Sequence, residues 1–295
     1  MRYLPHWCSG PLGLLLYALN TLLCALPLLL LALVKLLSRG RLRRHISRWL
    51  DAIVSGWVTT NNAIQQWTTG VEIHAEGLEG LSPNDWYLVI ANHQSWVDIL
   101  VLQRLFHGRI PFLKFFLKRQ LIWVPVLGLA WWALDFPFMR RYTREQLARQ
   151  PQLRGKDVAT TRKACEKFRQ LPVAVINFVE GTRLTPAKHQ HQHSPYHHLL
   201  LPRAGGVAHV LACMGDQLHQ LLDVTIYYPQ GIPSFYDFVA GRVHRVEVLV
   251  QRQPIDAALI GDYQGDARFQ QRFQNWLNQL WQSKDEQLQR LRARG

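Results

Sequence analysis

A histidine and an aspartate five residues apart, His93 and Asp98, are the residues in this chain whose types and spacing best suit general-base chemistry. They lie between an apolar run, 86–91, that is typical of a buried strand and an apolar stretch, 96–106, that is typical of a helix. Residues five apart lie about 140° apart on a helix, so the two side chains meet only if His93 lies in the turn and Asp98 in the first helical turn. Asp98 would then orient one imidazole nitrogen and leave the other as a base. A substrate that brings its own hydroxyl needs no serine or cysteine nucleophile.

A second polar group, Glu180 to Arg183, also comes directly after a run that is typical of a buried strand, residues 172–178. Gly181 permits a tight turn, because glycine adopts backbone angles that other residues avoid. The planar guanidinium of Arg183 suits a phosphate, and Glu180 could anchor either that guanidinium or the turn. The pattern leaves open a simpler possibility, in which a salt bridge between Glu180 and Arg183 only closes the turn.

Both groups resemble motifs of the PlsC-type glycerolipid acyltransferases, the family of the 1-acylglycerol-3-phosphate O-acyltransferases. Residues 92–98 are similar to the family's HX4D motif, and residues 178–183 are similar to its FPEGTR motif, with Val179 where proline is usual. The resemblance implies an enzyme that transfers a fatty-acyl group from a thioester to the free hydroxyl of a lysophospholipid.

Two further blocks support this resemblance. Lys118, a Pro-x-x-Gly at 125–128 and a Phe-x-x-Arg that ends at Arg141 are similar to the family's second block. Residues 199–206 are similar to its proline block, in the form Leu-x-Pro-Arg-x-x-Gly. That form is typical of a branch that includes bacterial YihG-type and animal lysocardiolipin-type acyltransferases. The length of the chain and its apolar N-terminus are most similar to the YihG type.

The resemblance also implies a role for individual residues and substrates. His93 would be the catalytic base and Asp98 its partner. No metal and no bound cofactor is required, because the acyl donor, acyl-CoA or acyl carrier protein, is a substrate. Lysophosphatidate is the family's commonest acceptor. The residues that the resemblance implies for substrate binding are Glu180, Gly181, Thr182, Arg183, Lys118 and Arg141.

The composition indicates an anionic partner. The formal net charge is +14, which favours either nucleic acid or an acidic membrane surface. The 11 tryptophans favour the membrane, and the sequence has no recognisable nucleic-acid motif. Four scattered cysteines form no disulfide or zinc pattern, which suits a reducing compartment. A non-catalytic membrane protein that binds acidic lipids fits the charge as well as an enzyme does.

The stretch 11–37 is apolar enough to cross a bilayer, which needs roughly 20 residues. The sequence favours a single span over a hairpin in one leaflet, which Pro27 leaves open. Five arginines between positions 39 and 48 predict an inner-membrane protein whose catalytic part faces the cytoplasm. Apolar residues at helical spacing in 41–69 fit either an interfacial helix or an ordinary helix packed on the domain.

Strand-like and helix-like runs alternate from residue 70 onward, which predicts an α/β fold, and the resemblance implies a mixed sheet flanked by helices. Four parts are expected: a membrane anchor at 1–40, a basic amphipathic helix at 41–69, a catalytic domain at 70–255 and a helical segment at 256–295.

Two stretches of the catalytic domain have more than one interpretation. The apolar stretch 121–139 fits an acyl-chain groove, a membrane-facing patch or plain core packing. The segment 189–198 holds five histidines at loose spacing, without a nearby acidic or cysteine partner, and predicts a solvated loop rather than a metal site.

Overall fold

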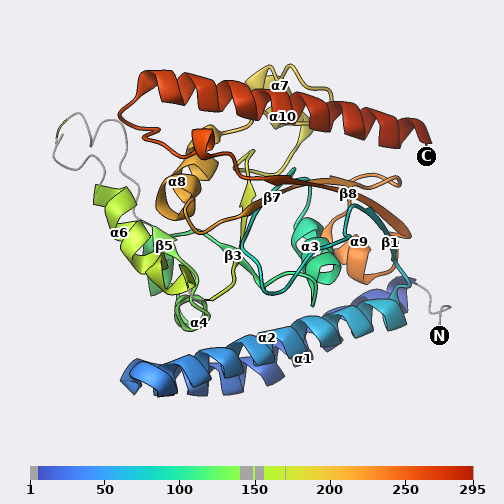
Figure 1. The fold of residues 1–295 in the computed structure, drawn as a ribbon. Helices are drawn as coiled ribbons and strands as arrows, with labels where there is room; N and C mark the ends of the chain where they lie inside the picture. The colour runs from blue at the N-terminus through green and yellow to red at the C-terminus, as the bar shows by residue number, and fades with distance from the viewer. Residues whose placement is uncertain (1–5, 140–148, 150–155, 170, 295) are drawn as a thin grey trace.

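A six-stranded mixed sheet runs through the computed structural model, which describes residues 6–139, 149, 156–169 and 171–294 (Figure 1). The strand order is β1-β8-β7-β2-β6-β3, and all neighbours are parallel except β7 and β8. The predicted α/β fold with a mixed sheet is therefore confirmed. The strands are β1 (Glu72–Glu76), β2 (Tyr87–Ala91), β3 (Leu113–Phe115), β6 (Ala174–Phe178), β7 (Gln220–Tyr227) and β8 (Arg245–Pro254), and a separate pair joins β4 (Leu117–Lys118) to β5 (Phe138–Met139).

Helices cover both faces of the sheet, which explains why its central strand is continuously apolar. Leu88 and Ile90 of β2 pack into the cluster formed with α8 and α10, whereas Tyr87, Val89 and Ala91 pack into the cluster formed with α3 and α9. The helices are α3 (Val97–Phe106), α4 (Leu127–Ala133), α6 (Lys156–Cys165), α7 (Pro186–Gln192), α8 (Ala204–Met214), α9 (Phe235–Val239) and α10 (Ala267–Arg294), with 3₁₀ turns η1 (Arg119–Trp123), η3 (Glu166–Arg169) and η4 (Ala257–Leu259).

Two long N-terminal helices, α1 (His6–Leu37) and α2 (Gly40–Thr68), pack side by side beneath the domain (Figure 1). The helix α1 is continuous through Pro27, so the stretch does not break there into two short helices. Near its start, Ser9 Oγ donates to Ala240 O at 2.8 Å. Near its end, the buried Lys35 donates to Ala133 O at 2.6 Å and to the Asp135 carboxylate at 2.7 Å. Both ends of α1 are therefore attached to the same domain.

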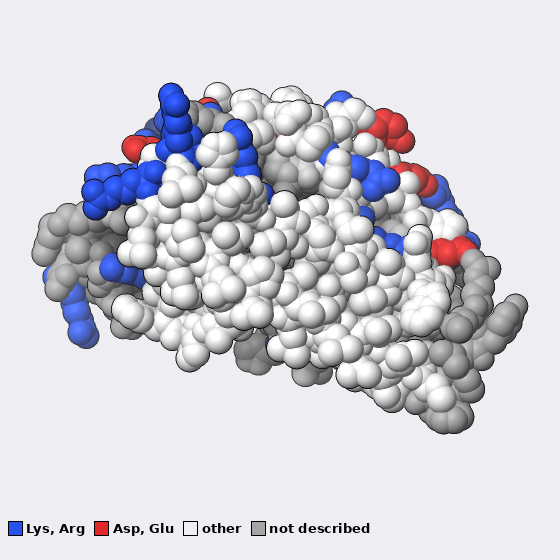
Figure 2. Space-filling model, turned by 90° about the horizontal axis from the view of Figure 1, so that it is seen from below, with Lys and Arg blue, Asp and Glu red and all other residues white. Residues whose placement is uncertain are grey.

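The underside of these two helices is apolar. Seen from below, it forms a broad uncharged surface with lysine and arginine only around its edge (Figure 2). The helix α2 has a buried side that includes Ile46, Leu50 and Val54, and an exposed side that carries Trp49 and Trp67. The exposed leucines of α1 are Leu14, Leu15, Leu19, Leu22, Leu23, Leu26, Leu30, Leu33, Leu36 and Leu37.

The stretch 121–139 divides between surface and core. Trp123 is 85% exposed, whereas Ala133, Leu134 and Phe136 are buried against α1 and α2. Core packing therefore accounts for the second half of this stretch, and the first half adds exposed apolar surface next to the N-terminal helices.

The segment predicted to be a solvated loop contains a helix, so this prediction was wrong in part. The helix α7 begins after Thr185, whose side chain accepts a hydrogen bond from Lys188 N, and it has a proline in its first turn. His193 ends it in the left-handed conformation. Thr185 followed by Pro186 is a recognised signal for a helix start, and the histidines obscured it.

Candidate active site

The turn formed by residues 92–98, here called the His93 turn, lies where β2 ends and α3 begins. His93 Nδ1 is 2.9 Å from Asp98 Oδ2, as the five-residue spacing predicts. The same carboxylate oxygen accepts the backbone N–H groups of Gln94 at 2.7 Å and Ser95 at 2.9 Å. Asp98 is completely buried, so three donors from one short segment hold one oxygen in place.

The second oxygen of Asp98 is also occupied. Tyr228 donates its hydroxyl hydrogen to Asp98 Oδ1 at 2.6 Å. Burial and the Asp98 charge raise the pKa of Tyr228 well above its usual value, so the phenol stays protonated and remains a donor. The His93 ring stacks on Phe178 with 4.0 Å between centroids and is 12% exposed. Because Nδ1 donates to the carboxylate, the lone pair of the neutral ring is on Nε2.

Glu180 connects the His93 turn to the proline block. It accepts the backbone N–H of His93 at 2.9 Å through one oxygen and that of Leu200 at 3.0 Å through the other. Glu180 is fully buried, whereas Arg183 is exposed and stacks over the Trp96 ring at 5.0 Å. The salt bridge that would close this turn is not among the contacts of the described residues, so Glu180 anchors two backbone segments instead.

Burial raises the pKa of Glu180 to about 8, although the two backbone N–H bonds lower it. The pKa of Glu180 is higher in the folded than in the unfolded protein. The contribution of this carboxyl group to the unfolding free energy is therefore fully present below about pH 4.5 and is lost as the pH rises toward 8. We therefore expect the unfolding free energy of Glu180→Gln to fall less steeply over this window than that of the parent protein, by up to about 1.4 kcal/mol per pH unit. Denaturant unfolding in micelles at several pH values measures this slope, and equal slopes in both proteins would contradict the assignment.

Residues 180–183, here called the Glu180 turn, include one cation, Arg183, and have two more beside them, Lys188 and Arg203. The Arg183 guanidinium lies over Trp96, as described above. Lys188 Nζ donates to Thr182 Oγ1 at 2.6 Å and to Arg183 O at 3.2 Å. The side chain of Arg203 passes so close to Gly181 that a Cβ there would lie 3.3 Å from its Cδ, and Gly181 has a φ of +69°. The positive φ therefore favours glycine at position 181, and any larger residue there would also require the Arg203 side chain to shift by a few tenths of an ångström.

The two turns are adjacent in space. Leu184, which directly follows Arg183, donates its backbone N–H to His93 O at 2.7 Å. The structure thus brings together His93, Asp98 and the Glu180 turn. Sequence reasoning missed Tyr228 and Lys188, because Tyr228 is 130 residues from its partner and Lys188 acts from a helix that was not predicted.

Of the two binding residues that the second block implies, Lys118 and Arg141, the structure describes Lys118. Lys118 ends β4, is exposed, and pairs in register with Met139. It follows β3, whose Phe115 ring stacks on Phe178 at 6.2 Å beside the His93 turn. Arg141 lies outside the residues that the structure describes.

Within the described part of the chain, no three His, Cys, Asp or Glu side chains are grouped so as to hold a metal. The histidines of 189–198 have other contacts: His189 Nε2 is 2.7 Å from Tyr196 O, and the backbone N–H groups of His197 and His198 donate to Asp285.

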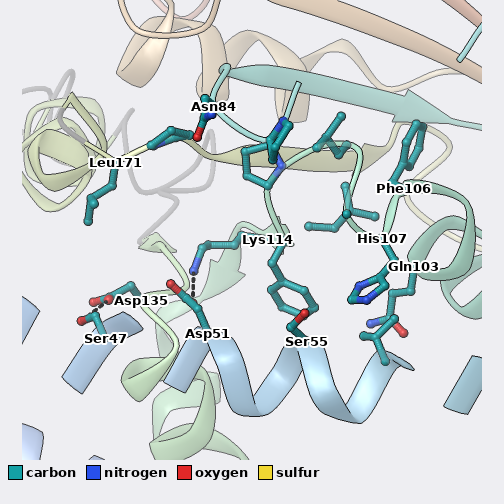
Figure 3. Close-up of a pocket in the computed structure, with 18 residues that line it drawn as sticks. Ser47, Asp51, Ser55, Asn84, Gln103, Phe106, His107, Lys114, Asp135 and Leu171 are labelled. Atoms are coloured by element: carbon teal, nitrogen blue, oxygen red, sulfur yellow. Dashed lines mark hydrogen bonds and ion pairs between the residues drawn. The ribbon is translucent and has the colours of Figure 1, made fainter. Parts of the chain in front are cut away.

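A separate pocket lies at the opposite edge of the sheet, between α2 and the loop that connects α3 to β3 (Figure 3). Lys114 points across it toward Asp51, with 3.9 Å between Nζ and Oδ1, and Asp135 lies 3.2 Å from Ser47 Oγ. No residue of the His93 turn or the Glu180 turn lines it. This pocket is therefore separate from the candidate active site.

Comparison with known proteins identifies the family of the chain. Residues 72–228, just over half of the chain, match the family model described as Acyltransferase. Lysocardiolipin acyltransferase 1 from Gallus gallus is 25% identical over 260 residues, which cover 82% of this chain and 64% of that protein. The 1-acyl-sn-glycerol-3-phosphate acyltransferase delta from Mus musculus is 26% identical over 214 residues, which cover 67% of this chain and 51% of that protein. The chain thus spans less than two thirds of the length of these curated relatives.

A solved structure shares the fold. PlsC, the 1-acyl-sn-glycerophosphate (LPA) acyltransferase from Thermotoga maritima, is similar over 98% of both chains, with a TM-score of 0.54 and 18% sequence identity. This similarity concerns the fold alone. The family match covers the His93 turn, the Glu180 turn and Tyr228. On this match, the chain belongs to the acyltransferase family.

Proposed function

We propose that this acyltransferase moves a fatty-acyl group from acyl-CoA or acyl carrier protein to the free hydroxyl of a lysophospholipid, with lysophosphatidate as the acceptor and phosphatidate as the product. The observation that carries the proposal is the buried Asp98 that orients His93 at 2.9 Å, directly beside the cationic Glu180 turn. The names of the relatives, which include both lysocardiolipin and 1-acylglycerol-3-phosphate acyltransferases, support a lysophospholipid acceptor. Within the family, the proline block, Leu199 to Gly206, supports the branch that includes the YihG-type and lysocardiolipin-type enzymes, and the apolar N-terminus supports the YihG type.

The reaction needs one proton acceptor and one anion site. The acceptor phosphate binds Arg183, with Lys118 and Arg141 as further cationic contacts, and Thr182 and Glu180 shape the turn. His93 Nε2 removes the proton from the glycerol hydroxyl, and the oxygen attacks the thioester carbonyl. The C–O bond forms, the C–S bond breaks, and the imidazolium returns its proton to the departing thiolate. Positioning and general-base assistance, which contributes about 10²–10⁴-fold, supply the catalysis.

We propose that the apolar underside of α1 and α2 binds the cytoplasmic leaflet of the inner membrane. The helix α1 is long and apolar enough to cross a bilayer. Its two ends, however, contact the same domain through Ser9 and Lys35, and a crossing helix would carry one end away from that domain. This packing favours a helix that lies in the membrane surface, with the exposed Trp49 and Trp67 of α2 at the interface. In this arrangement, residues 1–40 and the amphipathic helix at 41–69 attach the protein to the membrane, residues 70–255 form the catalytic domain, and residues 256–295 form a helical segment that covers the sheet.

The direct test uses the full-length protein in mixed micelles with lysophosphatidate and long-chain acyl-CoA. We expect free thiol and diacyl product to appear together. Thiol release without diacyl lipid would instead indicate a thioesterase. If no turnover occurs with several acceptors and both donor types, the alternative of a non-catalytic protein that binds acidic lipids is the better one.

Arg183→Gln is expected to raise the KM for lysophosphatidate about tenfold or more with little change in kcat, because a charge-assisted contact to phosphate contributes about 1.5–3 kcal/mol. Arg242→Gln is the matched control, since Arg242 is also exposed and lies over an aromatic ring, that of Tyr236, at 5.6 Å. Steady-state kinetics at varied lysophosphatidate concentration measures KM and kcat for both variants. An equal KM for both variants would exclude Arg183 from phosphate binding.

A further inference from the structure

A second cavity, of about 420 Å³, lies beside the His93 turn on its β7 side. The end of β7, the helix α7 with the segment that follows it, and the C-terminal end of α10 line it. We call it the Arg292 pocket. Its volume lies within the range of small-molecule sites. Its basic side chains are Arg292, His189, His197 and His198, and no aspartate or glutamate is among the described residues that line it.

A buried carboxylate fixes the backbone of the basic wall of this pocket. Asp285, which is buried, accepts the backbone N–H groups of His197 and His198 at 2.8 Å each. His198 Nδ1 is 3.4 Å from Arg292 Nη1. Because a guanidinium can only donate, this contact uses the lone pair of Nδ1 and leaves the ring proton on Nε2. Burial and the Arg292 charge lower the pKa of His198, so the ring stays neutral and keeps that N–H.

Arg292 is exposed and has no carboxylate partner among the residues that the structure describes. Its one hydrogen-bonding contact there is the neutral His198 ring. A guanidinium in this state keeps its positive charge and most of its donors for a ligand. Such a fork, beside imidazole groups and away from carboxylates, suits a phosphate group.

The pocket reaches the His93 turn through three residues. Gln94, which directly follows His93, lines it. Tyr228, which donates to Asp98, lines it as well. Leu184, whose N–H binds His93 O, forms another part of the wall. The Phe178 ring lies on the other side, because β2 separates β6 from β7. A ligand in the pocket would therefore flank the candidate base from the side opposite to Phe178.

We propose that the Arg292 pocket is a second phosphate subsite, distinct from the Glu180 turn, which binds a phosphate ester of one of the two substrates. This inference rests on the proposed function. The cavity is larger than a phosphate group, so it also accommodates part of the organic group that carries the phosphate. Two sources share this chemistry: the nucleotide phosphates of a CoA donor, and a second phosphate in the head group of the acceptor.

The test compares Arg292→Gln with Arg290→Gln, an exposed arginine two residues away on α10 that does not line the pocket. Each variant is assayed with acyl-CoA and with acyl-N-acetylcysteamine, a thioester without phosphate. Each is also assayed with lysophosphatidate, which has one phosphate, and with monolysocardiolipin, which has two. We expect Arg292→Gln alone to raise one KM about tenfold, with kcat nearly unchanged.

The pattern identifies the source of the phosphate. A KM that rises for acyl-CoA but not for acyl-N-acetylcysteamine assigns the pocket to the donor. A KM that rises for monolysocardiolipin but not for lysophosphatidate assigns it to the acceptor. If the KM values of Arg292→Gln for both donors and both acceptors match those of Arg290→Gln, the subsite is refuted.

A binding measurement separates this proposal from the proposed function. Calorimetric titration of CoA, and of monolysocardiolipin in micelles, requires no turnover. If the parent protein binds either ligand and Arg292→Gln binds it about tenfold more weakly, the subsite stands even for a protein that transfers no acyl group. If both proteins bind both ligands equally, or the parent binds neither, the proposal fails.

Discussion

His93→Ala is expected to lower the rate of acyl transfer by about 10²–10⁴-fold while the protein stays folded. The substitution removes the nitrogen that would accept the proton of the acceptor hydroxyl. It leaves Asp98 with three of its four hydrogen bonds, those from Gln94 N, Ser95 N and the Tyr228 hydroxyl. No buried charge loses all its partners, so the cost in stability should be small. Initial rates of diacyl product formation, together with the thermal unfolding midpoint in micelles, measure both effects.

The chain contains a natural control for this experiment. His219 and Asp85 form a second histidine–aspartate pair, with 2.8 Å between Nδ1 and Oδ1. This pair precedes β7 and β2, so it lies at the edge of the sheet opposite to the His93 turn. We expect His219→Ala to retain its activity. A comparable loss of activity in both variants would mean that the two substitutions act through the fold and that His93 is not the base.

The contact between His93 and Asp98 could be predicted from the sequence because it is local. A strand pattern, a five-residue spacing and a helix pattern leave the two side chains one way to meet. The strands were predictable for a related reason: β2 and β6 are buried on both faces, and burial imposes an apolar run on the sequence.

The connection between the two turns could not be predicted in the same way. Glu180 binds the backbone N–H groups of His93 and Leu200, which lie 87 and 20 residues away. A backbone N–H is present at every residue except proline, so such a bond leaves no trace in the partner's residue type. The sequence therefore offered Arg183 as a partner for Glu180, whereas in the structure Arg183 stacks on Trp96.

The placement of α1 depended on a similar long-range contact. Lys35 is a charged residue within the apolar stretch 11–37. In the structure it is fully buried, and it pairs with Asp135, which lies 100 residues further along the chain. A buried lysine needs such a partner, because an unpaired charge away from water is costly. This pair attaches α1 to the domain that the sequence alone treats as separate from it.

Two substitutions at Asp98 are expected to separate its charge from its hydrogen bonds. In Asp98→Asn, the amide oxygen can take the position of Oδ2 and accept from Gln94 N, Ser95 N and His93, while the amide nitrogen donates to the Tyr228 oxygen. The side chain keeps its bonds but loses its charge. We expect the fold to persist and turnover to fall on the order of 10²-fold, because the imidazolium that forms during the reaction loses an opposite charge, which contributes at most about 4 kcal/mol at about 4 Å and an effective dielectric constant of about 20.

Asp98→Ala is expected to lose both the negative charge of Asp98 and its hydrogen bonds. Two backbone N–H groups and the Tyr228 hydroxyl would lose their buried acceptor, at a cost of about 1–3 kcal/mol each. Turnover should fall to the level of His93→Ala, and the unfolding free energy should drop by roughly 3–5 kcal/mol. Kinetics and denaturant unfolding on the two variants distinguish these effects. If Asp98→Asn were as active as the parent protein, Asp98 would only position His93, and its charge would play no part in proton transfer.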